Sequence, residues 1–251
     1  MNNVIICFLI ALLGWVSGMI LNYLADVLPL RRRLALPFCR RCQSDLPALR
    51  YFLLPGNCPS CGYRYGVRAW FVSVVLIVGF VSIWLNEPAR LGTLGGWFWL
   101  AYFLLVIVID VEHHLILHPI SAIGAGIAIL TGSWMHGLKM TLAGGAVGFL
   151  IMFLFYLLGI GYARWSARRH GMPVAEGEAL GFGDVNLSGV IGLLLGWPGI
   201  IAGLMAAILL AGAVGLLALG IALLRRRYTP NLALPYGPFL AAAAILLLFF
   251  R

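Results

Sequence analysis

Long apolar runs separated by short polar stretches dominate the chain. A helix needs about 20 mostly apolar residues, and at least about 17, to cross about 30 Å of hydrocarbon. Eight segments are candidates, of which the sixth is short: residues 4–24, 69–85, 93–109, 119–134, 140–161, 184–195, 199–224 and 236–250. The pattern predicts an all-α, polytopic integral membrane protein with about eight transmembrane helices.

The segments predict three parts. Residues 1–24 form a first transmembrane helix, residues 25–68 a small polar loop with four cysteines, and residues 69–251 a transmembrane core. The first helix has no basic stretch before it and no small-residue cleavage site before the loop, so we expect it to be retained and not removed as a signal peptide.

The composition supports a membrane protein and excludes two other classes. Hydrophobic residues make up 63% of the chain and charged residues 10%, against about 45–50% and 25% in soluble domains. A soluble monomeric enzyme and a disordered chain are both excluded. The net charge of +9 would suggest nucleic acid in a soluble protein, but in a membrane protein basic residues report orientation.

The basic residues are distributed unevenly between alternate loops. With eight spans, one side of the membrane receives Arg31, Arg32, Arg33, Arg40, Arg41, Arg50, Arg64, Arg68, Arg164, Arg168, Arg169, Arg225, Arg226 and Arg227. The other side keeps only Arg90, Lys139 and Arg251. Basic loops face the cytoplasm, so both termini are expected outside it. The asymmetry explains the positive charge without a nucleic-acid partner.

The first loop contains two C-x-x-C pairs, Cys39–Cys42 and Cys58–Cys61. Four thiolates on two such turns are typical of a tetrahedral zinc site. Disulfides are the alternative, but a cytoplasmic loop lies in a reducing compartment, which favours zinc. A closed site of four cysteines is usually structural, so we expect zinc to fold the loop.

Two carboxylates stand at the ends of apolar segments. Asp110 ends the third segment, and Asp184 follows Gly181-Phe182-Gly183 and opens the sixth, both on the cytoplasmic side. A helix N-cap would explain Asp184, and a simple boundary position would explain Asp110. Ionisable groups at membrane depth are costly, however, and usually functional. Two adjacent carboxylates that share a proton can supply the general base and acid of an aspartyl peptidase.

These motifs together resemble the type IV prepilin peptidases, a family of membrane aspartyl peptidases with a Gly-x-Gly-Asp signature. The likeness covers nearly the whole chain: residues 18–22 ending in Asn22, the two cysteine pairs, residues 110–113, residues 181–185 and residues 235–241. The resemblance implies cleavage of the leader from prepilins or pseudopilins at the cytoplasmic face of the bacterial inner membrane. The substrate it implies is itself a hydrophobic helix that carries a short polar leader. Asp110 and Asp184 would be the catalytic pair, and membrane lipid would surround the helices.

The resemblance also implies supporting residues and a second reaction. Gly181 and Gly183 would support the second catalytic motif, and Glu112 and His113 the first, although a solvated Glu112 and a headgroup-level His113 are equally good interpretations. Many members then methylate the new N-terminus with S-adenosylmethionine.

Three positions depart from the family pattern. Asn186 replaces a usual lysine, His118 replaces a usual carboxylate, and Ser73 stands where a glutamate is usual. These departures leave two other functions open. One is an inactive scaffold that binds pilin subunits; the other is a transporter with proton-carrying carboxylates, which the placement at the membrane edge disfavours.

Overall fold

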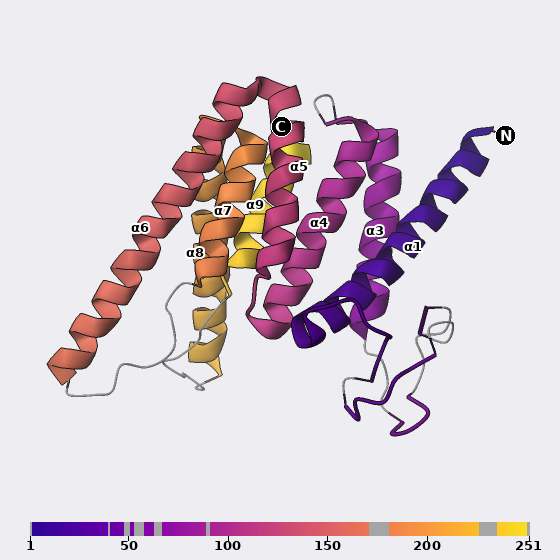
Figure 1. Ribbon diagram of the computed structural model, residues 1–251, viewed down its shortest axis with the longest axis horizontal. Helices are drawn as coiled ribbons and strands as arrows, with labels where there is room; N and C mark the ends of the chain where they lie inside the picture. Colours follow the sequence, from indigo (N-terminus) through magenta and orange to yellow (C-terminus); the bar gives the residue numbers. More distant parts are fainter. Residues whose placement is uncertain are drawn as a thin grey trace. The chain divides into compact units, whose positions relative to one another are not determined.

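The computed structural model describes residues 2–39, 41–47, 51–52, 58–62, 67–88, 91–170, 181–225 and 235–249. Within these ranges the chain has eight α-helices and one isolated antiparallel bridge, between Phe38 and Asp45 (Figure 1). It divides into two compact units, Met1–Ile109 and Asp110–Arg251.

Each predicted apolar segment corresponds to one described helix, which confirms the all-α prediction. The helices are α1 (Asn2–Arg31), α3 (Val67–Leu85), α4 (Gly92–His113), α5 (His118–His136), α6 (Leu138–His170), α7 (Phe182–Leu195), α8 (Gly199–Leu224) and α9 (Gly237–Phe249).

Five helices, α1, α3, α4, α6 and α8, are long and apolar enough to cross a membrane. Helices α7 and α9 are apolar but shorter; at 14 and 13 residues they rise about 20 Å, less than the hydrocarbon thickness of about 30 Å. Large apolar side chains remain exposed along α8, such as Leu209 at 68% and Leu216 at 71%. A contiguous apolar surface of this kind suits lipid and not water, as expected of a multi-pass membrane protein.

Two helices extend well beyond their predicted limits. Helix α1 continues to Arg31 instead of ending at residue 24, and α6 continues to His170 instead of residue 161. Hydropathy marks where a chain leaves hydrocarbon, whereas helical hydrogen bonding continues into polar sequence. The loop predicted to begin at residue 25 therefore begins after Arg31.

In the first unit, α1 packs along α3. A side-chain carbon on Gly18 would lie 2.8 Å from the Cα of Ser73, so the two helices touch through their backbones. Nearby, the Asn22 amide donates to the carbonyl of Ala69 at 3.1 Å. The Trp97 indole of α4 donates to the carbonyl of Phe80 at 3.0 Å. Small residues and these polar contacts hold the unit together, as is usual in lipid.

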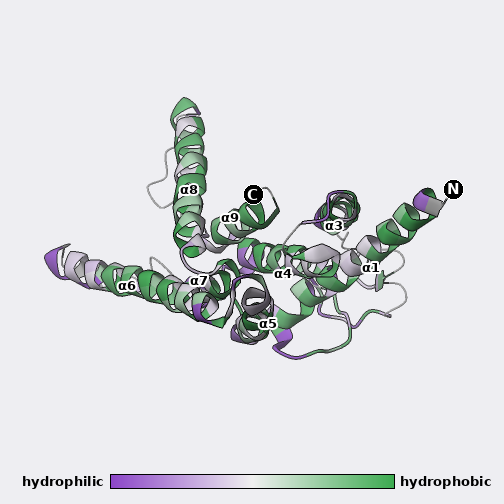
Figure 2. Ribbon diagram, turned by 90° about the horizontal axis from the view of Figure 1, so that it is seen from above, coloured by the Kyte–Doolittle hydropathy of each residue, from purple (hydrophilic) through white to green (hydrophobic). Residues whose placement is uncertain are grey.

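In the second unit, α7 lies between α5, α6, α8 and α9 (Figure 2). Its contact with α6 is the most extensive and depends on small residues: a side-chain carbon on Gly192 would lie 2.2 Å from the carbonyl oxygen of Gly144. One turn away, the buried Ser188 hydroxyl donates to the carbonyl of Gly148 at 2.9 Å. Surrounding helices thus cover most of this short helix, whose first turn carries Asp184.

Candidate active site

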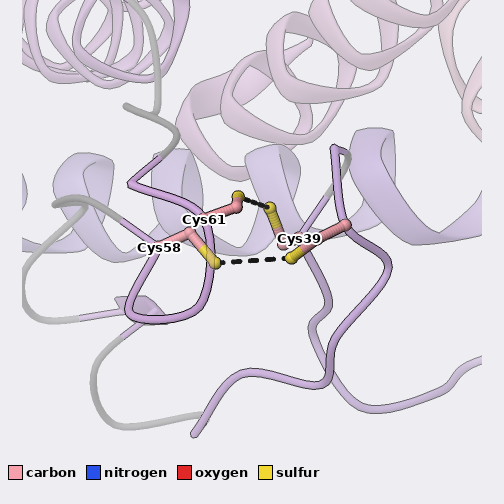
Figure 3. A group of neighbouring side chains, drawn as sticks. Cys39, Cys58 and Cys61 are labelled. Carbon is pink, nitrogen blue, oxygen red and sulfur yellow. Dashed lines mark hydrogen bonds between the residues drawn. The ribbon is translucent and has the colours of Figure 1, made fainter.

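The four predicted metal ligands gather in one cluster. The sulfur atoms of Cys39, Cys42, Cys58 and Cys61 all lie within 4.8 Å of one another, and none forms a disulfide. Two sulfur pairs, Cys39–Cys61 and Cys42–Cys58, are each 3.6 Å apart, close to the roughly 3.8 Å expected between thiolates bound to zinc at about 2.3 Å. Figure 3 shows the side chains of Cys39, Cys58 and Cys61 turned toward a common space. The cluster can therefore hold a metal ion.

Both halves of the cluster have the same backbone form. The N–H of Gln43 donates to the carbonyl of Cys39 at 2.8 Å, and the N–H of Gly62 donates to that of Cys58 at 2.9 Å. Gln43 and Gly62 both have positive φ, 58° and 68°, which glycine adopts without strain. Each C-x-x-C pair thus forms a tight turn that presents two sulfurs to the same side.

The turns also lower the pKa of one of the four thiols. Burial raises the pKa of the Cys58 thiol, but hydrogen bonds from the backbone N–H groups of Cys61 and Ser60 and from neighbouring thiols outweigh it and bring the pKa from 9.0 to about 6. The thiolate is the form that binds metal, so the loop is prepared for a cation at neutral pH.

A carboxylate at the end of α1 attaches this loop to the helices. Asp26 is 1% exposed and accepts a hydrogen bond from the Tyr51 hydroxyl of the loop. Its other oxygen lies 2.7 Å from the Arg68 guanidinium of α3. A buried charge needs such partners, and the ion pair fixes the loop to the two helices that flank it.

The two predicted catalytic carboxylates are both buried. Asp110 lies in the last turn of α4 and is 5% exposed, whereas Asp184 lies in the first turn of α7 and is 7% exposed. The N-cap of α7 is Gly181, with no side-chain cap. Asp184 is therefore not the N-cap residue of α7, and Asp110 is covered by protein.

The structure brings these carboxylates, 74 positions apart in sequence, into one cluster. They lie near enough for their charges to repel each other. The Ile116 side chain links their surroundings: a side-chain carbon on Gly183 would lie 2.7 Å from the Ile116 Cβ, and one on Gly237 would lie 3.1 Å from the Ile116 Cδ1. The two carboxylates therefore share one buried surrounding, in which their charges interact.

The supporting residues named from the sequence take different positions. Gly181 precedes α7 and Gly183 lies in its first turn, where the N–H of Asp184 donates to the carbonyl of Gly181 at 3.0 Å. Glu112 and His113 lie 4.0 Å apart at the end of α4, with about a quarter of each side chain exposed. Gly183 thus contacts Ile116, which also packs near Gly237. Glu112 and His113 form a separate, partly exposed pair.

Three residues of the cluster could not be assigned to it from the sequence. A side-chain carbon on Gly237 would lie 2.5 Å from Asp110 Oδ2, and the neighbouring Tyr236 interacts electrostatically with Asp184. His114, with a positive φ of 49°, interacts electrostatically with Asp110. The motif at residues 235–241 was visible in the sequence, but its contact with the carboxylates is a tertiary property.

Two of the three departures from the family pattern line one groove. His118 of α5 and Asn186 of α7 face it together with Phe149 of α6. The His118 ring stacks on that of Phe182, with 6.3 Å between centroids. Ser73 belongs to the first unit, where its hydroxyl donates to the carbonyl of Ala69 at 3.0 Å.

Comparison with known proteins gives a consistent result. Residues 97–217 match the type IV leader peptidase family. A prepilin leader peptidase/N-methyltransferase of Burkholderia pseudomallei is 28% identical over 243 residues, covering 90% of this chain and 71% of the relative. A type 4 prepilin-like proteins leader peptide-processing enzyme of Escherichia coli is 29% identical, covering 84% and 75%. A prepilin leader peptidase/N-methyltransferase of Bacillus subtilis is 27% identical, covering 85% and 80%. No solved structure gives a significant match.

Proposed function

We propose that this chain belongs to the type IV leader peptidase family, whose model it matches over residues 97–217, and that it is a membrane aspartyl endopeptidase that removes the leader from type IV prepilins or pseudopilins. The observation that carries the proposal is the cluster of two buried carboxylates, Asp110 and Asp184, with Gly237 packed against one of them.

The chemistry needs only the two carboxyl groups and a water molecule. One carboxylate removes a proton from the water, whose oxygen then bonds to the carbon of the scissile carbonyl. The other, protonated, carboxyl group donates its proton to the carbonyl oxygen. When the tetrahedral intermediate collapses, the C–N bond breaks and the leaving nitrogen takes the proton that the first carboxylate had removed from water. The second carboxylate takes a proton from a hydroxyl group of the intermediate, so both carboxyl groups return to their starting states. Because coupled groups titrate as a pair, Asp110 and Asp184 are interchangeable in these roles.

The metal we propose for the cysteine cluster is zinc. A set of four thiolates is typical of zinc, and it leaves no open position for catalysis. Zinc bound by Cys39, Cys42, Cys58 and Cys61 would supply folding energy to a loop in which, among the described residues, Leu46 and Tyr51 pack against the buried cysteines. Its role is structural.

The names of the relatives include an N-methyltransferase, which implies S-adenosylmethionine as the donor. A pocket in the first unit, lined by Asn22, Asp26, Arg68 and Ser73 together with apolar and aromatic residues, has a volume of about 50 Å³. Ligand pockets usually hold about 300–1,000 Å³, so this particular pocket does not fit a nucleoside-sized donor. Leader cleavage is the function that the two buried carboxylates support.

The location we propose is the bacterial inner membrane. The cysteine loop and the pair Asp110 and Asp184, called the dyad below, would lie on the cytoplasmic side, and both termini would lie outside the cytoplasm. The distribution of basic residues supports this orientation. Within the described ranges, the cytoplasmic side would carry nine basic residues and the other side one, Lys139. The nine are Arg31, Arg32, Arg33, Arg41, Arg68, Arg164, Arg168, Arg169 and Arg225. Arg40, Arg50, Arg64, Arg90, Arg226, Arg227 and Arg251 lie outside the described residues.

The test mixes detergent-solubilised protein with a panel of type IV prepilins, with and without S-adenosylmethionine, and reads the products by mass spectrometry. We expect loss of the leader with the wild-type chain and no cleavage with either Asp110→Asn or Asp184→Asn. Glu87→Gln is the matched control, because Glu87 is an exposed carboxylate paired with Thr93 outside the cluster. Complementation of a pilus defect by both aspartate variants would instead support the inactive scaffold.

A further inference from the structure

An apolar groove lies between α6 and α8 in the second unit. Figure 2 shows the two helices diverging on either side of α7. The groove has a volume of about 500 Å³ and is lined by Ile151, Met152, Phe155 and Gly159 of α6, by Ile201, Leu204, Met205 and Ile208 of α8, and by Tyr236. The α8 residues follow the i, i+3, i+4, i+7 spacing of one helix face, so the wall is a continuous apolar stripe.

The groove lies beside the carboxylate cluster. Tyr236, the polar residue of its lining, interacts electrostatically with Asp184 and precedes Gly237, which packs against Asp110. From the other side, the Phe182 ring at the start of α7 packs on Tyr156, 5.7 Å between centroids. The α6 stretch that lines the groove therefore also supports the turn that carries Asp184.

We propose that this groove binds the apolar helical segment of the substrate that follows the scissile bond, an inference that rests on the proposed peptidase function. A peptide bond held at Asp110 and Asp184 continues as chain on both sides. The polar leader on one side of this bond must reach water. The apolar segment on the other side needs an apolar surface, and because the segment starts at the scissile bond, this surface must begin next to Asp110 and Asp184. Of the pockets described above, this groove combines an apolar lining with that position.

A segment that lies in hydrocarbon must satisfy its own backbone hydrogen bonds, so we expect the bound segment to be helical. The volume of the groove, about 500 Å³, admits a few large side chains and not a whole helix, so the segment would insert one face, with anchors at helical spacing. Met152 and Met205 stand on opposite walls, and methionine adapts to side chains of different shape. The groove therefore suits substrates that share an apolar helix and differ in sequence.

Filling the groove tests the proposal. Ile208 lines it and is 47% exposed, whereas the adjacent Leu209, 68% exposed, does not line it. We measure kcat/KM for full-length prepilins and for a short peptide that spans the leader and the scissile bond but lacks the apolar segment. For Ile208→Trp we expect the ratio of full-length to peptide kcat/KM to fall by at least about tenfold, with Leu209→Trp matching the wild type. Equal ratios for the two variants would overturn the proposal.

Photocrosslinking separates this inference from the peptidase assignment, because it does not require cleavage. A benzoylphenylalanine is placed at Met205 or, as the control, at Leu209, in an Asp184→Asn background, and the chain is reconstituted with each prepilin in phospholipid vesicles. We expect adducts with the apolar segment of at least one prepilin from Met205 only. Adducts with phospholipid alone from Met205, across the whole panel, would show a lipid groove and refute the proposal. If Met205 captures prepilin while the wild type cleaves none, the groove stands and the peptidase function fails.

Discussion

The contact between Gly237 and Asp110 makes the active-site hypothesis quantitative. A methyl group in Gly237→Ala would lie 2.5 Å from Asp110 Oδ2, 3.1 Å from its Cγ and 3.1 Å from the Ile116 Cδ1. Ordinary contacts begin near 3.4 Å, so the carboxylate or the start of α9 must shift by about 0.9 Å. Since misplacing a catalytic group by about 1 Å can cost about 100-fold in rate, we expect kcat/KM for leader cleavage to fall by about that factor.

The assay compares Gly237→Ala with the wild type for leader loss by mass spectrometry, and for thermal unfolding in detergent. Gly237 begins α9 and alanine is a better helix former, so the helix itself should tolerate the change. Gly126→Ala is the matched control, because nothing lies within 4 Å of the added carbon at this glycine of α5; we expect it to retain full activity.

One result would refute the reasoning. If Gly237→Ala cleaved prepilin at the wild-type rate, with the same unfolding temperature, the start of α9 would not restrain the catalytic carboxylate. If both variants lost activity together with their folded structure, the pair Gly237→Ser and Gly126→Ser, compared in lipid nanodiscs, would separate misfolding from misplacement.

Three further predictions test the dyad, the helix packing and the metal site. Asp110→Asn and Asp184→Asn should each lower cleavage by at least about 100-fold, because each removes one partner of acid–base catalysis; activity in either variant would contradict the assignment. Gly192→Ala places a carbon 2.2 Å from a backbone oxygen of α6 and should cost about 1–3 kcal/mol of unfolding free energy, whereas Gly212→Ala, with open space around it, should cost none. Because the pKa of the Cys58 thiol is about 6 and not 9.0, the thiolate stabilises the folded loop fully above pH 9 and this contribution is lost as the pH falls through 6. Zinc binds the thiolate and competes with protons for it, so zinc occupancy, measured by mass spectrometry of the metal across a pH series, should fall as the thiolate is protonated. Zinc that stays bound well below pH 5 would contradict this.

The cysteine site shows how far local sequence can predict a site. The C-x-x-C spacing alone predicts two turns, and the structure has both, with positive φ after each second cysteine. That the turns face each other, with all sulfurs within 4.8 Å, depends on the chain between residues 42 and 58. Spacing predicted that closure only because two C-x-x-C pairs at this separation are typical of a zinc site.

The positions of the helices follow from the amino-acid sequence, because an apolar run of sufficient length leaves the backbone in lipid no alternative to internal hydrogen bonding. The sequence also singled out Asp110 and Asp184, because a carboxylate at membrane depth is costly enough to need a function. Only the tertiary structure placed Gly237 on Asp110, put Ile116 between the two motifs and separated α6 from α8 to form a groove. Those features depend on how closely backbones approach at particular glycines and on which faces of apolar helices remain uncovered, and neither is encoded in the hydropathy of a single segment.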